Sequence, residues 1–485
     1  EMADAIMKFG VEPWNFAELV EAFKQAPLYH LAFEVILVVF IIRLIFSKSY
    51  SIESTVKLTE AEREQLVQEW EPEPLVPPVD PNHPALHYKV ITKQGNNKLV
   101  VDGKEGINVG TFNFLGMLGR KETEDAAIQT MRKYGVGTCG PRGFFGTMDV
   151  HLNFEEKMAK HMGVEEAILY SYGFSTIASA IPAYAKKGDL VFCDEGVSFA
   201  IQMGLLASRS KLKFFKHNNM ADLERLLQEQ AVEDKKNPKK AKVMRKFIVV
   251  EGLYVNHGTI VDVEKLIELK YKYKVRVFMD ESMSFFVLGK TGRGVTEHAG
   301  VDITDIDLIS VSMEAALGTM GGFCLGTRYV VDHQRLSGLG YCFSASLPPM
   351  LASAASMAVD ITQKETDIFQ KLRSNNEFIH VQLSGLPGYR LDGDPISPIK
   401  HLRLEETSGD WQKDQAFLEK IVVRALDEGV VLTVARYLEE EEAFLPPPSI
   451  RIAVNVTLTE DQLTKITSVI RILAAAVLRE KSEGE

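Results

Sequence analysis

The residues DLISVSMEAALGTMGGFCLG, 307–326, decide how the rest of this chain is interpreted. The stretch begins with an apolar run from Leu308 to Val311, which is typical of a buried strand, and Phe323-Cys324-Leu325 is typical of a second strand. Small residues and the pair Gly321-Gly322 lie between them. A strand that ends in a small-residue loop beside another strand often forms the floor of a ligand site in an α/β domain. An ordinary strand–turn–strand would show the same pattern.

Length and composition are those of a large globular protein. The 485 residues are enough for more than one domain, with 46% hydrophobic and 25% charged residues. The 55 basic residues against 66 acidic ones give a net charge of −11, which argues against general nucleic-acid binding. The four cysteines are scattered without CxxC spacing, so we expect no metal site and no disulfide framework, in a reduced compartment.

Residues 1–46 predict attachment to a membrane. Residues 14–26 have apolar side chains at helical spacing, so we assign 1–26 to an amphipathic helix on the membrane surface. The run PLYHLAFEVILVVFIIRLIF, 27–46, is long enough to cross a bilayer, although Glu34 interrupts it. A buried core helix or an uncleaved signal sequence would share this run, but no basic region or small-residue cleavage site accompanies it. Arg43 and Lys48 favour a single-pass anchor with the following domain in the cytosol.

An acidic, proline-rich connector, 47–86, follows the anchor and includes an expected helix from about Glu60 to Trp70. From residue 87, strand patterns at 189–193, 247–250, 275–279, 308–312 and 322–325 alternate with helical ones. The helical patterns include 263–273 and a helix capped by Asn219. This alternation predicts an α/β domain over 87–378 with a mostly parallel sheet and helices on both faces.

Two further segments complete the organisation. We expect the basic run 234–246, which contains Asn237 and Pro238, to be a solvated loop. Residues 379–485 predict a small α+β domain, and its last helix opens at Thr459 with a capping box to Gln462.

Four more stretches, together with 307–326, resemble the motifs of a known enzyme family. They are FNFLG (112–116), YGVGTCGPRGFFGTMDVHLNFEE (134–156), VVEGLYVNHGTI leading to FMDESMSFFVLGKTGRGVTEH (249–260 and 278–298), and YCFSASLPP (341–349) followed by PPPSIRI (446–452). They resemble the α-oxoamine synthases, pyridoxal-phosphate enzymes that condense an amino acid with an acyl-CoA. The resemblance covers nearly all of 87–480. It implies a fold-type I pyridoxal-phosphate-dependent transferase-like fold with a large domain and a small C-terminal domain.

The resemblance also implies that this chain lacks the reactive group of the family. The position of the family's lysine falls on Ala315, and no lysine occurs between Lys290 and Lys364. The chemistry needs an amine that joins the cofactor aldehyde and then moves protons. Neither a methyl group nor the neighbouring carboxylate of Glu314 can do this.

Other family positions are partly kept. Two family histidines fall on Ser198 and Met283. Asp280 keeps the position that pairs with the ring nitrogen of the cofactor, although with the lysine gone it could equally be a carboxylate that caps a turn at a strand end. Arg451 falls where the family holds the substrate carboxylate, and the residues before it depart from the family pattern. We interpret Asp280, Met283, Ser198 and Arg451 as vestigial.

Active sites of this family lie at the interface between two subunits, so a chain without the lysine can serve an active partner. The resemblance is strongest to members that condense L-serine with palmitoyl-CoA to 3-ketosphinganine at the endoplasmic reticulum. It implies a lysine-bearing partner subunit that holds pyridoxal phosphate, small activating subunits, ORM-family regulators and the membrane. The residues that this chain would contribute in trans are Cys139, Gly140, Arg142, Ser344, Ala345 and Ser346.

Two other readings stay open from the sequence. The chain could be a membrane scaffold that contributes nothing to an active site. It could also be a self-sufficient acyltransferase with an unusual lysine, although the interval 291–363 contains none.

Overall fold

The computed structural model describes residues 21, 24–46, 58–76, 78, 79, 81, 86–95 and 97–484. The chain forms two compact units, Glu1–Pro74 and Leu75–Glu485, and their division falls inside the predicted connector, 47–86. Most of the predicted interfacial helix, 1–26, and the basic Lys48 lie outside the described residues.

The first unit contains two described helices. Helix α3 (Leu28–Phe46) has a mean hydropathy of 2.3, and none of its residues is buried. At 1.5 Å per residue its 19 residues span about 28 Å, close to the thickness of a bilayer core. This makes α3 a candidate membrane span. Glu34 lies 3.8 Å from His30 one turn earlier. Helix α4 (Glu60–Glu69) begins as predicted, with a capping box between Thr59 and Glu62.

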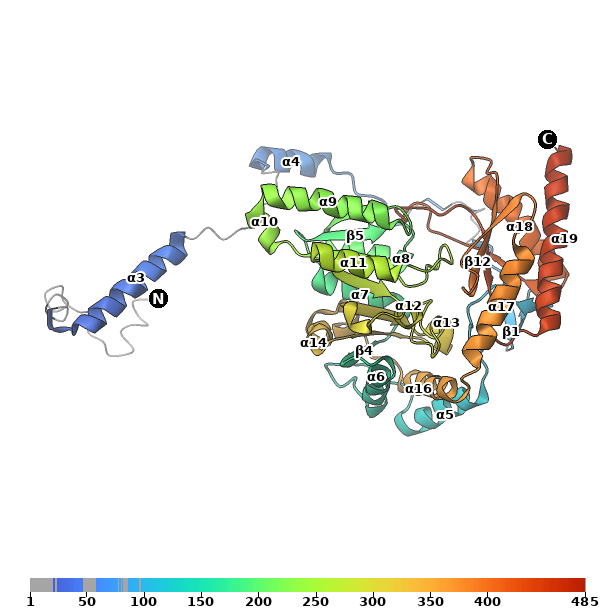
Figure 1. Ribbon diagram of the computed structural model, residues 1–485, viewed down its shortest axis with the longest axis horizontal. Helices are drawn as coiled ribbons and strands as arrows, with labels where there is room; N and C mark the ends of the chain where they lie inside the picture. The colour runs from blue at the N-terminus through green and yellow to red at the C-terminus, as the bar shows by residue number, and fades with distance from the viewer. Residues whose placement is uncertain are drawn as a thin grey trace. The chain divides into compact units, whose positions relative to one another are not determined.

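A seven-stranded sheet organises the second unit (Figure 1). Its strand order is β4 (Glu166–Tyr170), β10 (Gly322–Gly326), β9 (Leu308–Ser312), β8 (Arg276–Asp280), β7 (Lys246–Glu251), β5 (Leu190–Asp194) and β6 (Lys211–Phe215). The last five are parallel, whereas β10 is antiparallel to both of its neighbours. The five strands that the sequence predicts are confirmed to within a residue or two.

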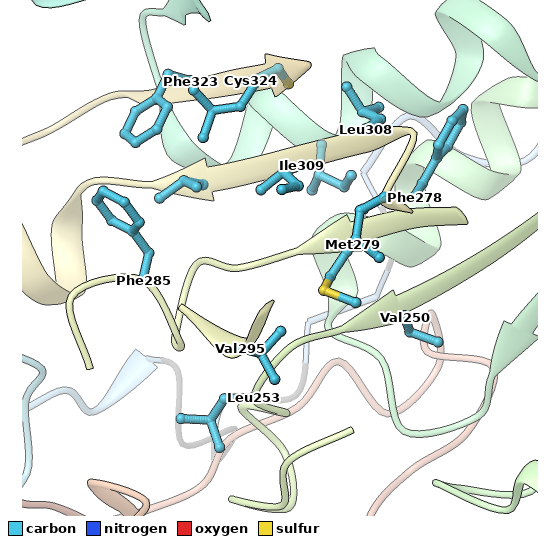
Figure 2. Close-up of a cluster of buried hydrophobic side chains, with 14 of the residues drawn as sticks. Val250, Leu253, Phe278, Met279, Phe285, Val295, Leu308, Ile309, Phe323 and Cys324 are labelled. Atoms are coloured by element: carbon cyan, nitrogen blue, oxygen red, sulfur yellow. The ribbon is translucent and has the colours of Figure 1, made fainter. Parts of the chain in front are cut away.

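The sheet is buried because its strands carry apolar side chains on both faces. Figure 2 shows this at the centre, where side chains of β8, β9 and β10 gather, among them Phe278, Ile309 and Phe323. Helices cover both faces (Figure 1). The helical elements of this lobe are α5 (Lys121–Tyr134), α6 (Asp149–Met162), α7 (Gly173–Tyr184), α8 (Phe199–Ser208), α9 (Met220–Lys236), α10 (Pro238–Val243), α11 (Val263–Tyr273), α12 (Val295–Ala299), the 3₁₀ turn η2 (Ile303–Asp305), α13 (Glu314–Leu317), α14 (Arg328–Ser337), α15 (Leu339–Cys342) and α16 (Pro349–Lys364).

Most of the local helix predictions hold, and one is wrong. Helix α11 has the predicted bounds, and the side chain of Asn219 caps α9 by accepting from the N–H of Asp222. The basic run 234–246, predicted as a loop, instead continues α9 to Lys236 and then forms α10. Pro238 stands in the first turn of α10, where proline is favoured because no intrahelical N–H is needed there.

A smaller lobe follows helix α17 (Ile368–Leu383), which runs through the predicted boundary at 378/379. Its sheet has the order β11 (Tyr389–Asp392), β12 (Ile399–Leu404), β15 (Ile450–Ala453) and β14 (Thr433–Val434), with helices α18 (Trp411–Asp427) and α19 (Glu460–Gly484). The capping box between Thr459 and Gln462 is confirmed. A further sheet joins β1 (Ile91–Gln94), β2 (Lys98–Val101) and β3 (Lys104–Asn108) to β13 (Val430–Val431), which ties the start of the second unit to this lobe.

Candidate functional site

The loop between β9 and β10 carries Ala315 at the carboxyl ends of the parallel strands. Residues 314–317 form the single turn α13, and Ala315 is buried within it. Its carbonyl accepts the N–H of Phe114 at 3.0 Å, while the Phe114 carbonyl accepts the N–H of Val456 at 2.9 Å. The FNFLG segment therefore links this loop to the smaller lobe through main-chain bonds. The side chain at 315 is a methyl group in a packed environment, and it cannot join an aldehyde.

Asp280 ends the neighbouring strand β8 and pairs in register with Ser310 of β9 and Glu251 of β7. Its carboxylate accepts the N–H of Ser282 at 2.8 Å, and the Ser282 hydroxyl accepts the N–H of Ser312 at 2.8 Å. Burial, with a smaller contribution from the negative charge of Glu314, raises the pKa of Asp280 to about 6. Asp280 is thus a buried carboxylate beside the loop that holds Ala315, and both turn capping and ring-nitrogen pairing fit its position.

Glu251 is a site residue that the sequence reasoning missed. It ends β7 and accepts the N–H groups of Ser198 and, at 2.9 Å, Val255. Burial, and then the charge of Asp280, raise its pKa to about 8. The sequence signal was the glutamate that closes the apolar run FIVVE before Gly252. This contact also places Ser198, the start of α8, at the same edge of the sheet.

Glu281, the residue after Asp280, is the third buried carboxylate of this edge. It accepts the N–H of Val295 and the hydroxyl of Ser284, and burial raises its pKa to about 7. Met283, which falls on a family histidine, is partly buried against the main core. This edge of the sheet is therefore rich in carboxylates. It carries the hydroxyl of Ser198 and the thioether of Met283 at the two positions that correspond to family histidines.

The glycine-rich loop, 134–147, is held in place by buried polar contacts. The guanidinium of Arg142 makes a bidentate pair with Glu155, at 2.8 and 3.0 Å, and its Nε donates to the hydroxyl of Thr147 at 3.0 Å. Nδ1 of His151 accepts the N–H of Met148, so Nε2 donates to the Leu347 carbonyl at 2.7 Å. Burial lowers the pKa of His151, which keeps the ring neutral in this role. Arg142 thus positions the loop.

The same loop is folded so tightly that two of its glycines leave no room for a side chain. A Cβ on Gly140 would fall 2.0 Å from the Phe144 carbonyl oxygen, and one on Gly146 would fall 2.1 Å from that of Gly140. Between these glycines, Phe145 has a positive φ of 62° and its side chain is 98% exposed. Phe144 and Phe343 are also largely exposed.

A cavity of about 310 Å³ joins the glycine-rich loop to the stretch 341–349. The N–H of Ser346 donates to the Gly140 carbonyl at 3.1 Å, and the hydroxyls of Ser346 and Thr138 lie 3.2 Å apart. The Ser171 hydroxyl donates to the Ala345 carbonyl. The residues that line the cavity are Val136, Gly137, Thr138, Cys139, Ser171, Tyr172, Met320, Ala345, Ser346, Pro348 and Leu351. The structure therefore brings together Cys139, Ala345 and Ser346, with Gly140 in contact through Ser346.

Ser344 and Arg451 are among the predicted residues that lie outside this lining. Ser344 precedes Ala345 and is half-buried. Arg451 lies on β15, where Nη2 donates to the Gly110 carbonyl at 3.3 Å and the guanidinium stacks 4.3 Å from the ring centre of Phe112. Its buried Nε has no hydrogen-bond partner among the described residues. Arg451 thus joins the smaller lobe to the FNFLG segment.

The residues of this chain do not fit a pyridoxal-phosphate site of its own. Ala315 supplies no amine, and the carboxylate of Glu314 lies at the start of α7, 3.2 Å from the N–H of Gly173. The cavity between the glycine-rich loop and 341–349 is the part of this region that could receive a ligand or a partner. The loops that form it carry exposed aromatic side chains.

Comparisons with known proteins identify the family of this chain. The family described as aminotransferase class I and II matches residues 104–470. The chain is 43% identical over 449 residues to long chain base biosynthesis protein 1b of Oryza sativa subsp. japonica, covering 93% of this chain and 92% of the relative. It is 40% identical over 451 residues to serine palmitoyltransferase 1 of Dictyostelium discoideum, covering 91% and 93%. A solved structure of serine palmitoyltransferase with pyridoxal phosphate matches with a TM-score of 0.72 and 26% identity, covering 81% of this chain and 93% of that one.

Proposed function

Because this chain belongs to the aminotransferase class I and II family and, within it, to the serine palmitoyltransferase 1 and long chain base biosynthesis protein 1 group, we propose that it is the non-catalytic subunit of a heteromeric serine palmitoyltransferase. That enzyme would condense L-serine with palmitoyl-CoA to 3-ketosphinganine. The observation that carries the proposal is the buried methyl group of Ala315 in a scaffold that otherwise keeps the fold of the enzyme.

The missing amine supports a partner subunit that does the chemistry. Pyridoxal phosphate, when bound, supplies an electron sink for carbanion chemistry, and it needs a lysine amine to hold it. The partner, a lysine-bearing long-chain-base subunit 2, would supply that lysine. Among this chain's vestigial positions, the Ser198 hydroxyl and the Met283 thioether cannot exchange protons near neutral pH as an imidazole does. Asp280 and Arg451 would remain as structural groups.

The contribution of this chain would be the cavity of the glycine-rich loop, completed by the partner. Cys139, Gly140, Ser344, Ala345 and Ser346 would then face the shared site, and the buried pair of Arg142 with Glu155 would hold them there. Phe144, Phe145 and Phe343 support a partner at this face, since exposed aromatic side chains are typical of interface cores.

The proposal extends to a location and to further partners. Helix α3 would anchor the chain in the endoplasmic reticulum membrane in a single pass, with the second unit in the cytosol. Small activating subunits and ORM-family regulators would bind the same complex. The apolar surface of α3 supports a membrane or protein environment around it.

The test is to purify the complex from membranes, reduce it with borohydride, and map the pyridoxyl adduct by peptide mass spectrometry. We expect a lysine-bearing subunit to co-purify and to carry the adduct. An adduct on a lysine of this chain at the partner's yield would refute the non-catalytic assignment.

A second measurement separates this proposal from a scaffold without a role in the site. Cys139→Trp places a bulky ring in the cavity lining and should lower turnover of the complex while the partner still co-purifies. Val381→Trp, at an exposed position on α17, is the control and should change neither. Unchanged turnover of the complex with Cys139→Trp would favour a scaffold that contributes nothing to the active site.

A further inference from the structure

A basic surface lies at the amino ends of the parallel strands, whereas the carboxylates of the candidate site stand at their carboxyl ends. The run 234–246 contains seven basic residues and one acidic residue; it ends α9, forms α10 and reaches the start of β7 (Figure 1). Lys246, the first residue of β7, is in register with Leu190 of β5, and Leu190 is in register with Lys211 of β6. Together with the turn that leads into β5, we call these residues the basic face: Lys186, Lys187, Lys211, Lys235, Lys236, Lys239, Lys240, Lys242, Arg245 and Lys246.

Much of the charge of the basic face is not neutralised. Arg245 pairs with Asp189 at 2.7 Å, and Lys246 pairs with Asp234. The five lysines between positions 235 and 242 are exposed, and none of them forms an ion pair with another residue that the structure describes. The chain as a whole carries a net charge of −11, so this positive surface stands out against the overall charge. Clusters of unpaired like charges repel one another and favour an anionic partner.

The lysines come from different elements and gather around one hollow. A cavity of about 140 Å³ is lined by Lys211 of β6, Lys236 of α9 and Lys240 of α10. Glu233 and Asp234 are the acidic residues of its lining, and each is itself within ion-pair distance of a lysine. The basic face is therefore a continuous surface of the folded lobe and more than a run of charges along the sequence.

The candidate span α3 indicates which anionic partner is at hand. Because the same chain continues from α3 into the second unit, a membrane that α3 spans is present at high local concentration around that unit. Cytosolic leaflets carry anionic lipids, and these attract clusters of Lys and Arg that lie near a membrane span. A lipid surface also fits an open convex group of lysines better than a small ligand does, since a small ligand needs an enclosed site.

We propose that the basic face binds the anionic headgroups of the membrane that α3 spans, and that this second attachment orients the second unit on the membrane surface. The carboxyl ends of the strands, and with them the candidate site, would then stay free for the partner subunit. The inference rests on the proposed function for its membrane anchor and does not depend on the missing amine at Ala315.

The first test uses the complex with its partner, reconstituted in phosphatidylcholine vesicles and in vesicles that contain about 20% phosphatidylserine. A membrane-impermeant reagent acetylates exposed lysines, and mass spectrometry measures the rate at each one. Rates at Lys235, Lys239 and Lys240 should fall about threefold or more in the anionic vesicles and recover in about 0.5 M salt, because salt screens the attraction. Lys413, which is 78% exposed on α18, is the internal control and should react equally in both vesicles.

The second test separates lipid contact from repulsion of the reagent by anionic vesicles. Lys240→Gln combined with Lys242→Gln should restore the acetylation of Lys239 in anionic vesicles, because the surface then holds the lipid more weakly. The matched control is Lys371→Gln combined with Lys413→Gln, two exposed positions on α17 and α18, and it should leave Lys239 protected. All four side chains are exposed, so these variants should fold as the unaltered chain does.

The outcomes distinguish this inference from the proposed function. If the complex floats with both kinds of vesicle and the basic face reacts equally in both, the inference is overturned and the membrane anchor stands. Equal protection in both would mean that protein covers the basic face, because cover by protein does not depend on lipid charge. Protection of Lys239 that persists in Lys240→Gln/Lys242→Gln would also overturn the inference. A complex that fails to float with phosphatidylcholine vesicles would refute the anchor itself, and the inference with it.

Discussion

Replacing Arg142 with methionine should destabilise the second unit by several kcal/mol. The side chains of Arg142 and Glu155 are 5% and 8% exposed, and two hydrogen bonds join them. Methionine keeps much of the volume of arginine and removes its charge. Among the described residues, the substitution leaves the buried carboxylate of Glu155 with the N–H of Leu169, at 2.8 Å, as its one remaining donor.

The magnitude follows from which charge is left behind. Removing one partner of a buried ion pair costs about 3–5 kcal/mol, because the other charge stays uncompensated in a medium of low polarity. At about 1.4 kcal/mol per tenfold change, 4 kcal/mol lowers the folding equilibrium by roughly a thousandfold. In Arg142→Met/Glu155→Met no charge remains, and the main loss is the acceptor for Leu169, about 1–3 kcal/mol. The double variant should therefore be more stable than the single one.

The assay is urea unfolding of the purified chain, with hydrogen exchange of the amides in 134–147 as a local measurement. The control is Lys98→Met, which breaks a pair of similar length, 2.7 Å to Glu105 against 2.8 Å for Arg142 and Glu155, whose side chains are about half exposed. Exposed pairs contribute about 0–1 kcal/mol, so this variant should behave almost as the unaltered chain does. If Arg142→Met and Lys98→Met lose the same stability, the reasoning from burial is refuted.

Three further outcomes are expected. The folded chain keeps the Glu251 proton to a higher pH than the unfolded chain does, so the stability that this group contributes is lost as the pH rises from 4.5 to about 8, and Glu251→Gln should make that loss smaller. Thermal melts at matched pH values would contradict this if melting temperature depended on pH equally in the variant and the unaltered chain. Gly146→Ala should cost about 1–3 kcal/mol by overpacking and Gly143→Ala almost nothing, since a Cβ on Gly143 meets no atom within 4 Å; equal melting temperatures would refute the packing argument. Deleting residues 1–46 should release a folded second unit from membranes, and a truncated chain that still sediments with them under high salt would show another attachment.

The sequence predicts elements best where one local signal dominates. Helix α11 has its predicted bounds because its apolar positions recur at helical spacing between a capping Asp262 and a terminal Lys274 in the left-handed conformation. The run around Pro238 was predicted wrongly because the same residue that ends one helix can begin the next. Strands β4 and β6 were absent from the prediction, although they are as long as the predicted strands β5, β8, β9 and β10. The two lysines of β6, Lys211 and Lys213, interrupt the continuous apolar run that is typical of a buried strand.

In the candidate site, too, local motifs predict the positions of residues, whereas contacts between distant segments could not be predicted. The family motifs were sufficient to place Ala315 in the loop after β9 and Asp280 at the end of β8. The contact of Glu314 with Gly173 joins residues 141 positions apart, and no local pattern in the sequence indicates it. Long-range contacts of this kind depend on the order of strands in the sheet. That order is set by the packing of the whole lobe.

The strand order also determines when the seven-stranded sheet can be completed during synthesis of the chain. Within the described part of the chain, β4 hydrogen-bonds to β10 alone, so the apolar strand ending at Tyr170 has no partner until Gly326 has been made. At about 5–20 residues per second, the intervening stretch of 156 residues takes roughly 8–30 s to synthesise. Throughout that time an unpaired apolar strand edge is open to other nascent chains, which makes β4 the segment where early chaperone binding would protect this protein most.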